Sequence, residues 1–140
     1  MGQLEHVKKR WVQYTPEELE ASNKYSQLKQ RSKAKGLELL WKREDFISWY
    51  IKVPKRCYYC GCTLDDIRRF WELNDSKRKV TRGRSFEIDR LKDESYSENN
   101  CVLACYWCNN ARSDVFTPYE FKIIGEAIGK VIKSKVNNAK

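Results

Sequence analysis

Apolar positions recur at helical spacing near both ends of the chain and alternate with polar ones in the middle. The segment Thr15-Pro-Glu-Glu18 combines an N-cap threonine, a first-turn proline and a glutamate at the capping-box position. It predicts a helix that ends near Gly36. Leu19, Tyr25 and Leu28 give this helix only a thin apolar stripe, so we expect it to form a surface arm.

The same capping signature predicts two further helices. Apolar residues at helical spacing follow both Thr63-Leu-Asp-Asp66 and Thr117-Pro-Tyr-Glu120. We expect the second of these helices to pack on the core or on a second subunit, and the sequence favours neither. The apolar residues are Ile67, Phe70, Trp71 and Leu73 in the first helix, and Phe121, Ile124, Ala127, Ile128, Val131 and Ile132 in the second.

Between these helices the pattern changes to alternation. Phe86 and Ile88 alternate with polar residues in 84–90, which predicts a short half-buried strand, and residues 101–105 predict a second one. A polar loop, 92–100, is rich in turn-forming residues and joins the two strands. Residues 109–114 predict a short helix after the second strand. We therefore expect an α+β fold in a small single domain.

Composition narrows the class of protein. The chain has 140 residues, which suit one compact domain or two very small ones. Lys and Arg number 28 against 19 Asp and Glu, a formal net charge of +9, so nucleic acid is the favoured partner. No apolar run approaches the ~20 residues that span a bilayer, and the first residues lack a secretion signal. We expect no membrane partner and a cytoplasmic location, in a bacterium or as a phage protein in its host.

The cysteines add a metal site. Two C-x-x-C pairs, at 57–60 and 105–108, suit a tetrahedral Zn²⁺ better than disulfides in a chain without a secretion signal. Cys62 follows the first pair closely enough to compete as a ligand, whereas Cys101 lies in an apolar stretch and is expected to be a small buried residue. Both are left out of the predicted structural zinc site, whose ligands are Cys57, Cys60, Cys105 and Cys108.

These motifs resemble the HNH, or ββα-metal, endonucleases, in the zinc-clipped four-cysteine branch that includes phage HNH proteins and PacI-type restriction endonucleases. The resemblance rests on four segments in the family's order, 57–61, 86–90, 96–100 and 104–113, and extends more weakly to 34–37, 45–50 and 116–131. It implies a central zinc-clipped ββα motif flanked by helices. The expected organisation is an N-terminal tail (1–14), a helical lead-in that forms a DNA-binding arm (15–56), the nuclease core with its C-terminal helix (57–135) and a tail (136–140).

The resemblance also implies an activity, hydrolysis of phosphodiester bonds in double-stranded DNA by a metal-dependent endonuclease, with restriction as one setting. Asp89 and Asn109 match the family's positions for the catalytic Mg²⁺ or Mn²⁺, and a carboxylate with an amide oxygen suits such a hard ion. A homodimer would match a palindromic site and cut both strands, whereas a monomer would nick.

The chain departs from the family at Arg90, where most members carry the histidine that acts as general base. A guanidinium cannot accept that proton, so Arg90 is assigned to clamp a phosphate. His6 lies far from these motifs and is not expected to be catalytic. Relatives that share Asp-Arg at this point are thought to use a tyrosine. Tyr96 is the candidate here, with Tyr25, Tyr58 and Tyr59 as alternatives.

Other residues are assigned to structure or to DNA. Asn100 matches the middle asparagine of the family motif and is expected to pin the inter-strand loop, and Arg112 to contact the scissile or an adjacent phosphate. A basic face on the first helix and the basic stretch 77–84 are expected to neutralise DNA phosphates. The residues concerned are Lys24, Arg31 and Lys35 on the helix, and Lys77, Arg78, Lys79, Arg82 and Arg84 in the stretch.

Two alternatives stay open at this point. One is a phage nicking, homing or junction-resolving endonuclease with the same chemistry. The other is a catalytically silent zinc DNA-binding module, because Arg90 replaces the usual base. Asp89 and Asn109 argue against that module, since pure binding needs no such pair of oxygen ligands. RNA is a weaker choice of partner because the aromatic residues form no evident stacking motif.

Overall fold

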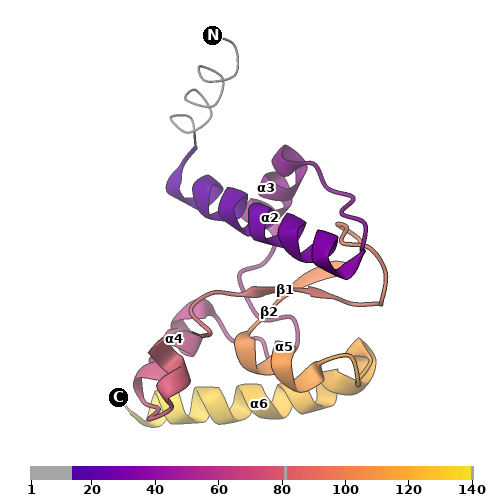
Figure 1. The fold of residues 1–140 in the computed structure, drawn as a ribbon. Coiled ribbons are helices and arrows are strands. Elements are labelled where there is room, and N and C mark those ends of the chain that lie inside the picture. The colour runs from indigo at the N-terminus through magenta and orange to yellow at the C-terminus, as the bar shows by residue number, and fades with distance from the viewer. Residues whose placement is uncertain (1–13, 81, 140) are drawn as a thin grey trace. The chain divides into compact units, whose positions relative to one another are not determined.

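The computed structural model describes residues 14–80 and 82–139 (Figure 1), so His6 and nearly all of the predicted tail 1–14 lie outside the described residues. The chain divides into two compact units. The first comprises residues up to Val53 together with 94–99, and the second comprises Pro54–Asp93 and the residues from Asn100 onward. Together they hold helices and one two-stranded sheet, which confirms the predicted α+β class. None of the helices in these two described ranges has both the length and the apolar character needed to cross a membrane.

The first unit is built on helices α2 (Pro16–Lys35) and α3 (Arg43–Lys52), which pack side by side. The predicted start of α2 is confirmed, because the Thr15 side chain accepts a hydrogen bond from the Glu18 N–H and Glu18 accepts one from the Thr15 N–H. Its end is confirmed at Gly36, whose φ of 68° is the left-handed conformation that glycine adopts most readily.

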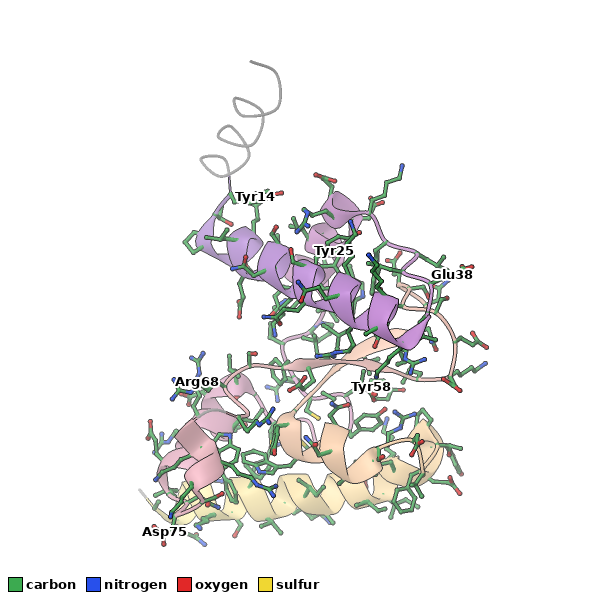
Figure 2. The ribbon with its side chains drawn as sticks, viewed as in Figure 1. Tyr14, Tyr25, Glu38, Tyr58, Arg68 and Asp75 are labelled. Carbon is green, nitrogen blue, oxygen red and sulfur yellow. The ribbon has the colours of Figure 1, made fainter. Side chains whose placement is uncertain are left out.

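An aromatic cluster forms the core between these helices. The Tyr25 hydroxyl, on α2 (Figure 2), donates a 2.8 Å hydrogen bond to the Trp41 carbonyl. The guanidinium of Arg43 lies 4.7 Å from the centre of the Tyr25 ring and donates to the Ser22 carbonyl. Phe46 is fully buried and packs edge-on against Trp41. The hydroxyl of Tyr25 is therefore engaged in holding the first unit together.

Residues 94–99 belong to the first unit although they lie in the loop between the two strands. Tyr96 forms a parallel bridge with Leu39, in which the Tyr96 N–H donates to Glu38 and the Tyr96 carbonyl accepts from the Leu40 N–H, both at 2.9 Å. The Tyr96 side chain is 2% exposed. The sequence predicted a polar loop here and gave no sign of this pairing.

The second unit contains the ββα motif. Its elements are α4 (Leu64–Glu72), η1 (Lys77–Val80), β1 (Glu87–Arg90), β2 (Cys101–Ala104), α5 (Tyr106–Arg112) and α6 (Pro118–Asn138). Strands β1 and β2 are antiparallel, with Ile88 opposite Leu103 and Asp89 opposite Val102, and helix α5 follows directly. Figure 1 shows α5 lying along the final helix, α6.

Helix α6 runs further than the sequence predicted. It begins at its predicted cap, with reciprocal hydrogen bonds between Thr117 and Glu120, and continues to Asn138. Residues 136–138, expected to be tail, are helical and Val136 is buried. Neither glycine nor proline occurs after Gly129, so nothing in the sequence ends the helix earlier.

Two glycines allow α6 to lie directly on the turn that carries the first cysteine pair. A Cβ atom at Gly125 would lie 2.7 Å from the Cβ of Tyr59, and one at Gly129 would lie too close to the Cys60 carbonyl oxygen to be accommodated without a shift. Phe121, one turn earlier, packs edge-on against the Tyr59 ring. Close contact with the backbone of α6 thus fixes the position of the turn that carries the first cysteine pair.

This packing predicts that Gly129→Ala destabilises the protein although alanine is the better helix former. The helical gain is at most about 1 kcal/mol, whereas forcing a methyl group against a backbone carbonyl costs about 1–3 kcal/mol. We expect the free energy of unfolding in urea to fall by about 1–2 kcal/mol. Glu126→Ala, on the exposed side of α6, is the control and should change it little. A Gly129→Ala protein as stable as wild type would contradict the close contact.

Candidate active site and metal centre

The four cysteines selected from the sequence form one cluster. Cys57 and Cys60 lie in a tight turn, Cys105 is the N-cap of α5, and Cys108 lies in its first turn. All four are buried, and their Sγ atoms lie within 4.8 Å of one another. The Cys60 and Cys105 sulfurs are 3.8 Å apart. A tetrahedral four-thiolate zinc with Zn–S bonds of about 2.3 Å places its sulfurs at about that separation, so the cluster fits such an ion.

The backbone around the cluster favours thiolates. The N–H of Cys60 points to the Sγ of Cys57 and the N–H of Cys108 to the Sγ of Cys105, at 3.5 and 3.4 Å. Hydrogen bonds from the thiols of Cys105 and Cys108 lower the pKa of Cys57 to about 7, and the same contacts raise the pKa values of the two donor thiols. Thiolate is the form that binds a metal.

Cys62 and Cys101 lie outside this cluster. The Cys62 carbonyl accepts a hydrogen bond from the Cys57 N–H and so closes the turn, and a hydrogen bond to Cys60 raises the pKa of its buried thiol. Cys101 is buried in β2, opposite Arg90. Within the described residues, the four-sulfur group therefore contains only the two C-x-x-C pairs.

Asp89 places a buried carboxylate in β1, where it is 8% exposed. The Tyr59 hydroxyl donates a 2.6 Å hydrogen bond to its Oδ2 atom. The Arg112 Nη1 atom donates to Oδ1 and Oδ2, both at 3.0 Å. Loss of solvation raises the pKa of Asp89, and the hydrogen bond from Tyr59 and the charge of Arg112 only partly oppose this. Asp89 is thus desolvated but held by two partners.

Arg112 ends helix α5 and is 7% exposed. Besides the bonds to Asp89, its Nη1 donates to the Arg90 carbonyl at 3.1 Å and its Nη2 to the Leu91 carbonyl at 3.0 Å. Its Nε atom is buried and has no hydrogen-bond partner among the described residues. The guanidinium therefore fastens the end of the helix to the end of the strand. Its predicted contact with a DNA phosphate stays a prediction.

Tyr59 is the tyrosine whose hydroxyl donates a hydrogen bond to the Asp89 carboxylate. It stands between the two cysteines of the first pair, and the Arg112 guanidinium lies 5.7 Å from the centre of its ring. Burial and the hydrogen bond to Asp89 raise the pKa of Tyr59, so it holds its proton at neutral pH. Its neighbour Tyr58 (Figure 2) is instead exposed, with the Lys122 ammonium 5.3 Å from its ring centre.

Both predicted asparagines follow Asp89 along the chain, Asn100 just before β2 and Asn109 within α5. Asn109 is partly exposed on α5 and precedes Arg112 by three residues, so both lie on one face of a helix that packs against β1. Asn100 is buried, accepts a hydrogen bond from the Lys92 N–H and donates one to the Lys92 carbonyl, at 3.0 and 3.1 Å. These two bonds join the two ends of the loop 92–100, and the role of Asn100 in the proposed site stays a prediction.

The remaining predicted residues have varied environments. Arg90 is partly exposed and pairs with the Asp93 carboxylate at 3.1 Å. Tyr96 lies in the first unit. The predicted DNA-binding residues stay predictions. Lys24, Arg31 and Lys79 are half-buried, and Lys35, Lys77, Arg78, Arg82 and Arg84 are exposed.

The sequence does not indicate that Tyr59, Asp89 and Arg112 lie together. The position of Tyr59 between Cys57 and Cys60 could have indicated it, because a metal bound to these cysteines would also hold the residues between them in place. A signal for Arg112 was its spacing of three residues from Asn109. Neither spacing shows that both side chains turn toward one carboxylate.

No protein-family model matches the sequence. The solved structure of the rare-cutting HNH restriction endonuclease PacI is similar over 77% of this chain and 75% of the PacI chain, with a TM-score of 0.65 and 27% identity. An uncharacterized protein of Acanthamoeba polyphaga mimivirus is 30% identical over 94 residues, which are 66% of this chain and 14% of the viral protein. The chain thus matches only a small part of that relative's length. It has an HNH-like α+β fold with a four-cysteine cluster, and the likeness to PacI supports a DNA endonuclease at the level of the family.

The cluster predicts that Cys57→Ser abolishes metal binding and unfolds the second unit, because a structural zinc contributes much of the folding energy of a small domain. Native mass spectrometry should find one zinc per wild-type chain, and circular dichroism should show loss of structure in the variant.

The matched control is Cys62→Ser, which changes a buried thiol outside the cluster and should keep one zinc. A stably folded, zinc-free Cys57→Ser protein would refute the structural role. A second zinc in the wild type would instead implicate Cys62 or Cys101.

Proposed function

We propose that this protein is an HNH-type endonuclease that hydrolyses phosphodiester bonds in double-stranded DNA with Mg²⁺ or Mn²⁺, and that Zn²⁺ on its four cysteines is structural. The observation that carries the proposal is the buried Asp89 carboxylate, held by Tyr59 and Arg112 in a ββα fold like that of PacI. Asp89 and Asn109 are the ligands proposed for the divalent ion.

The donor set suits this chemistry. A carboxylate offers about four acceptor positions, and the hydrogen bonds from Tyr59 and Arg112 use three of them, two on Oδ2 and one on Oδ1. One position on Oδ1 is left for a hard cation, and the partly exposed amide of Asn109 supplies a second oxygen. When bound, such an ion supplies charge for the developing phosphorane and assists the leaving oxygen.

The proposed base is Tyr59 rather than Tyr96. Tyr59 is hydrogen-bonded to the carboxylate that would hold the ion, whereas Tyr96 is buried in the first unit, where its backbone pairs with residues 38–40. A tyrosine accepts a proton from water only when it is ionised. Burial and the carboxylate of Asp89 oppose that ionisation in the free protein, and the guanidinium of Arg112 favours it. A divalent ion bound to Asp89 would offset the opposing charge of the carboxylate and so favour the ionised tyrosine.

The basic residues supply the rest of the proposal. A net charge of +9 favours binding to a polyanion, and the exposed Arg82 and Arg84 lead directly into β1. A double-strand cut by a single-site enzyme needs two copies, so we propose a homodimer on a palindromic site. A nicking, homing or junction-resolving enzyme would use the same groups on a different substrate.

The first prediction of this proposal concerns metal-dependent cleavage. At low salt, wild-type protein should convert supercoiled plasmid to linear DNA with Mg²⁺ or Mn²⁺ but not with EDTA, and Asp89→Asn should abolish cleavage because the amide carries no charge to attract the ion. The control Asp65→Asn removes an exposed carboxylate on α4 and should leave cleavage unchanged.

Product topology distinguishes the alternatives. Open circles alone would indicate a nickase. Equal DNA binding by wild type and Asp89→Asn, without cleavage of plasmid or of genomic DNA that offers many sites, would favour the silent zinc module over an endonuclease.

The second prediction concerns the base. Tyr59→Phe keeps the ring packing on Phe121 but removes the hydroxyl, so cleavage should slow by about a hundredfold or more, the usual contribution of a general base. Tyr96→Phe removes a buried hydroxyl from the first unit and should keep most of the activity. The reverse order of effects, measured in the same plasmid assay, would make Tyr96 the tyrosine of the reaction.

A further inference from the structure

The ion pair between Arg112 and Asp89 carries a consequence for metal binding that rests on the proposed function. Both side chains are buried, and the guanidinium contacts both carboxylate oxygens at 3.0 Å. The positive charge of the Arg112 guanidinium compensates the negative charge of Asp89 within the protein. The proposed ligand set, Asp89 and Asn109 with Arg112 behind them, therefore has a net charge of zero.

A neutral site attracts a divalent cation less than an uncompensated carboxylate does, because charges interact strongly in a buried environment and the repulsion by the guanidinium offsets part of the attraction by the carboxylate. A DNA phosphate changes this balance by adding a negative charge beside the ion. We infer that Arg112 weakens divalent-ion binding by the free protein, so that the ion is held tightly only together with DNA. Under this inference metal and DNA bind cooperatively, each raising the affinity of the other by the same factor.

Arg112 also has a structural use, because it joins α5 to the carbonyls of Arg90 and Leu91. The two uses predict opposite effects on metal affinity. If Arg112 only positioned Asp89, its loss would disorder the carboxylate and weaken ion binding. If its charge compensates Asp89, its loss leaves an uncompensated carboxylate and strengthens ion binding. A gain of affinity is thus a result that a purely structural role does not produce.

The experiment measures Mn²⁺ binding by the zinc-loaded, full-length protein in the absence of DNA, from the electron paramagnetic resonance signal of free Mn²⁺. Arg112→Gln removes the charge, Arg112→Lys keeps it and loses the planar fork, and Asp89→Asn identifies the site. We expect Arg112→Gln to bind Mn²⁺ at least about tenfold more tightly than wild type, and Arg112→Lys to stay within about threefold of it. The gain should disappear when Asp89→Asn is added.

An affinity of Arg112→Gln equal to or weaker than that of wild type overturns the inference. If circular dichroism shows that Arg112→Gln does not fold, Arg112→Lys decides. Unchanged Mn²⁺ affinity supports the role of the charge, and clearly weaker affinity shows that the fork acts only by positioning. Plasmid cleavage by wild type separates the two proposals. Cleavage without the expected gain overturns this inference alone, whereas absence of both cleavage and any Asp89-dependent Mn²⁺ site overturns the proposed function as well.

Discussion

The second unit depends on the cluster of four buried thiols. Its two cysteine pairs join a tight turn early in the unit to the start of α5, two segments separated by more than forty residues. The turn carries Tyr59 and the helix carries Arg112, and both side chains contact the same carboxylate. Helix α6 closes over the turn through Gly125 and Gly129, where a side chain would not fit. A metal on these sulfurs would therefore hold in place the two segments whose side chains hydrogen-bond to Asp89, without itself contacting that carboxylate.

The burial of the Asp89 carboxylate determines which partners it needs. A carboxylate removed from water is unfavourable unless it is paired, and here its partners are a phenol and a guanidinium. These partners make the carboxylate rigid and nearly saturate its oxygens. The same arrangement raises the pKa of Tyr59. In the proposed enzyme, the Asp89 carboxylate is thus held rigidly but binds a divalent ion weakly on its own. The phosphate of the DNA substrate supplies the additional negative charge that the ion needs.

Local signals were sufficient to predict most elements. The caps at Thr15, Thr63 and Thr117 set helix starts through short-range hydrogen bonds, which depend on residues three positions apart. The cysteine cluster followed from spacing as well. The contact of Tyr59 and Arg112 with Asp89 did not, because it joins residues 23 and 30 positions away and depends on the packing of three elements. The pairing of Tyr96 with Leu39 and the continuation of α6 to Asn138 were missed because neither has a local sequence marker.

The assignment of residues 94–99 to the first unit makes the hairpin loop a shared part of the molecule. The chain leaves β1, contributes a segment that pairs with residues 38–40, and returns to β2, so the backbone passes between the units three times. A truncation that removes residues up to 53 would therefore leave Tyr96, a large buried aromatic residue, without its backbone partners. The N-terminal helices consequently cannot be removed or replaced independently of the loop between β1 and β2. Any transfer of these helices to another protein would have to carry the hairpin loop with them.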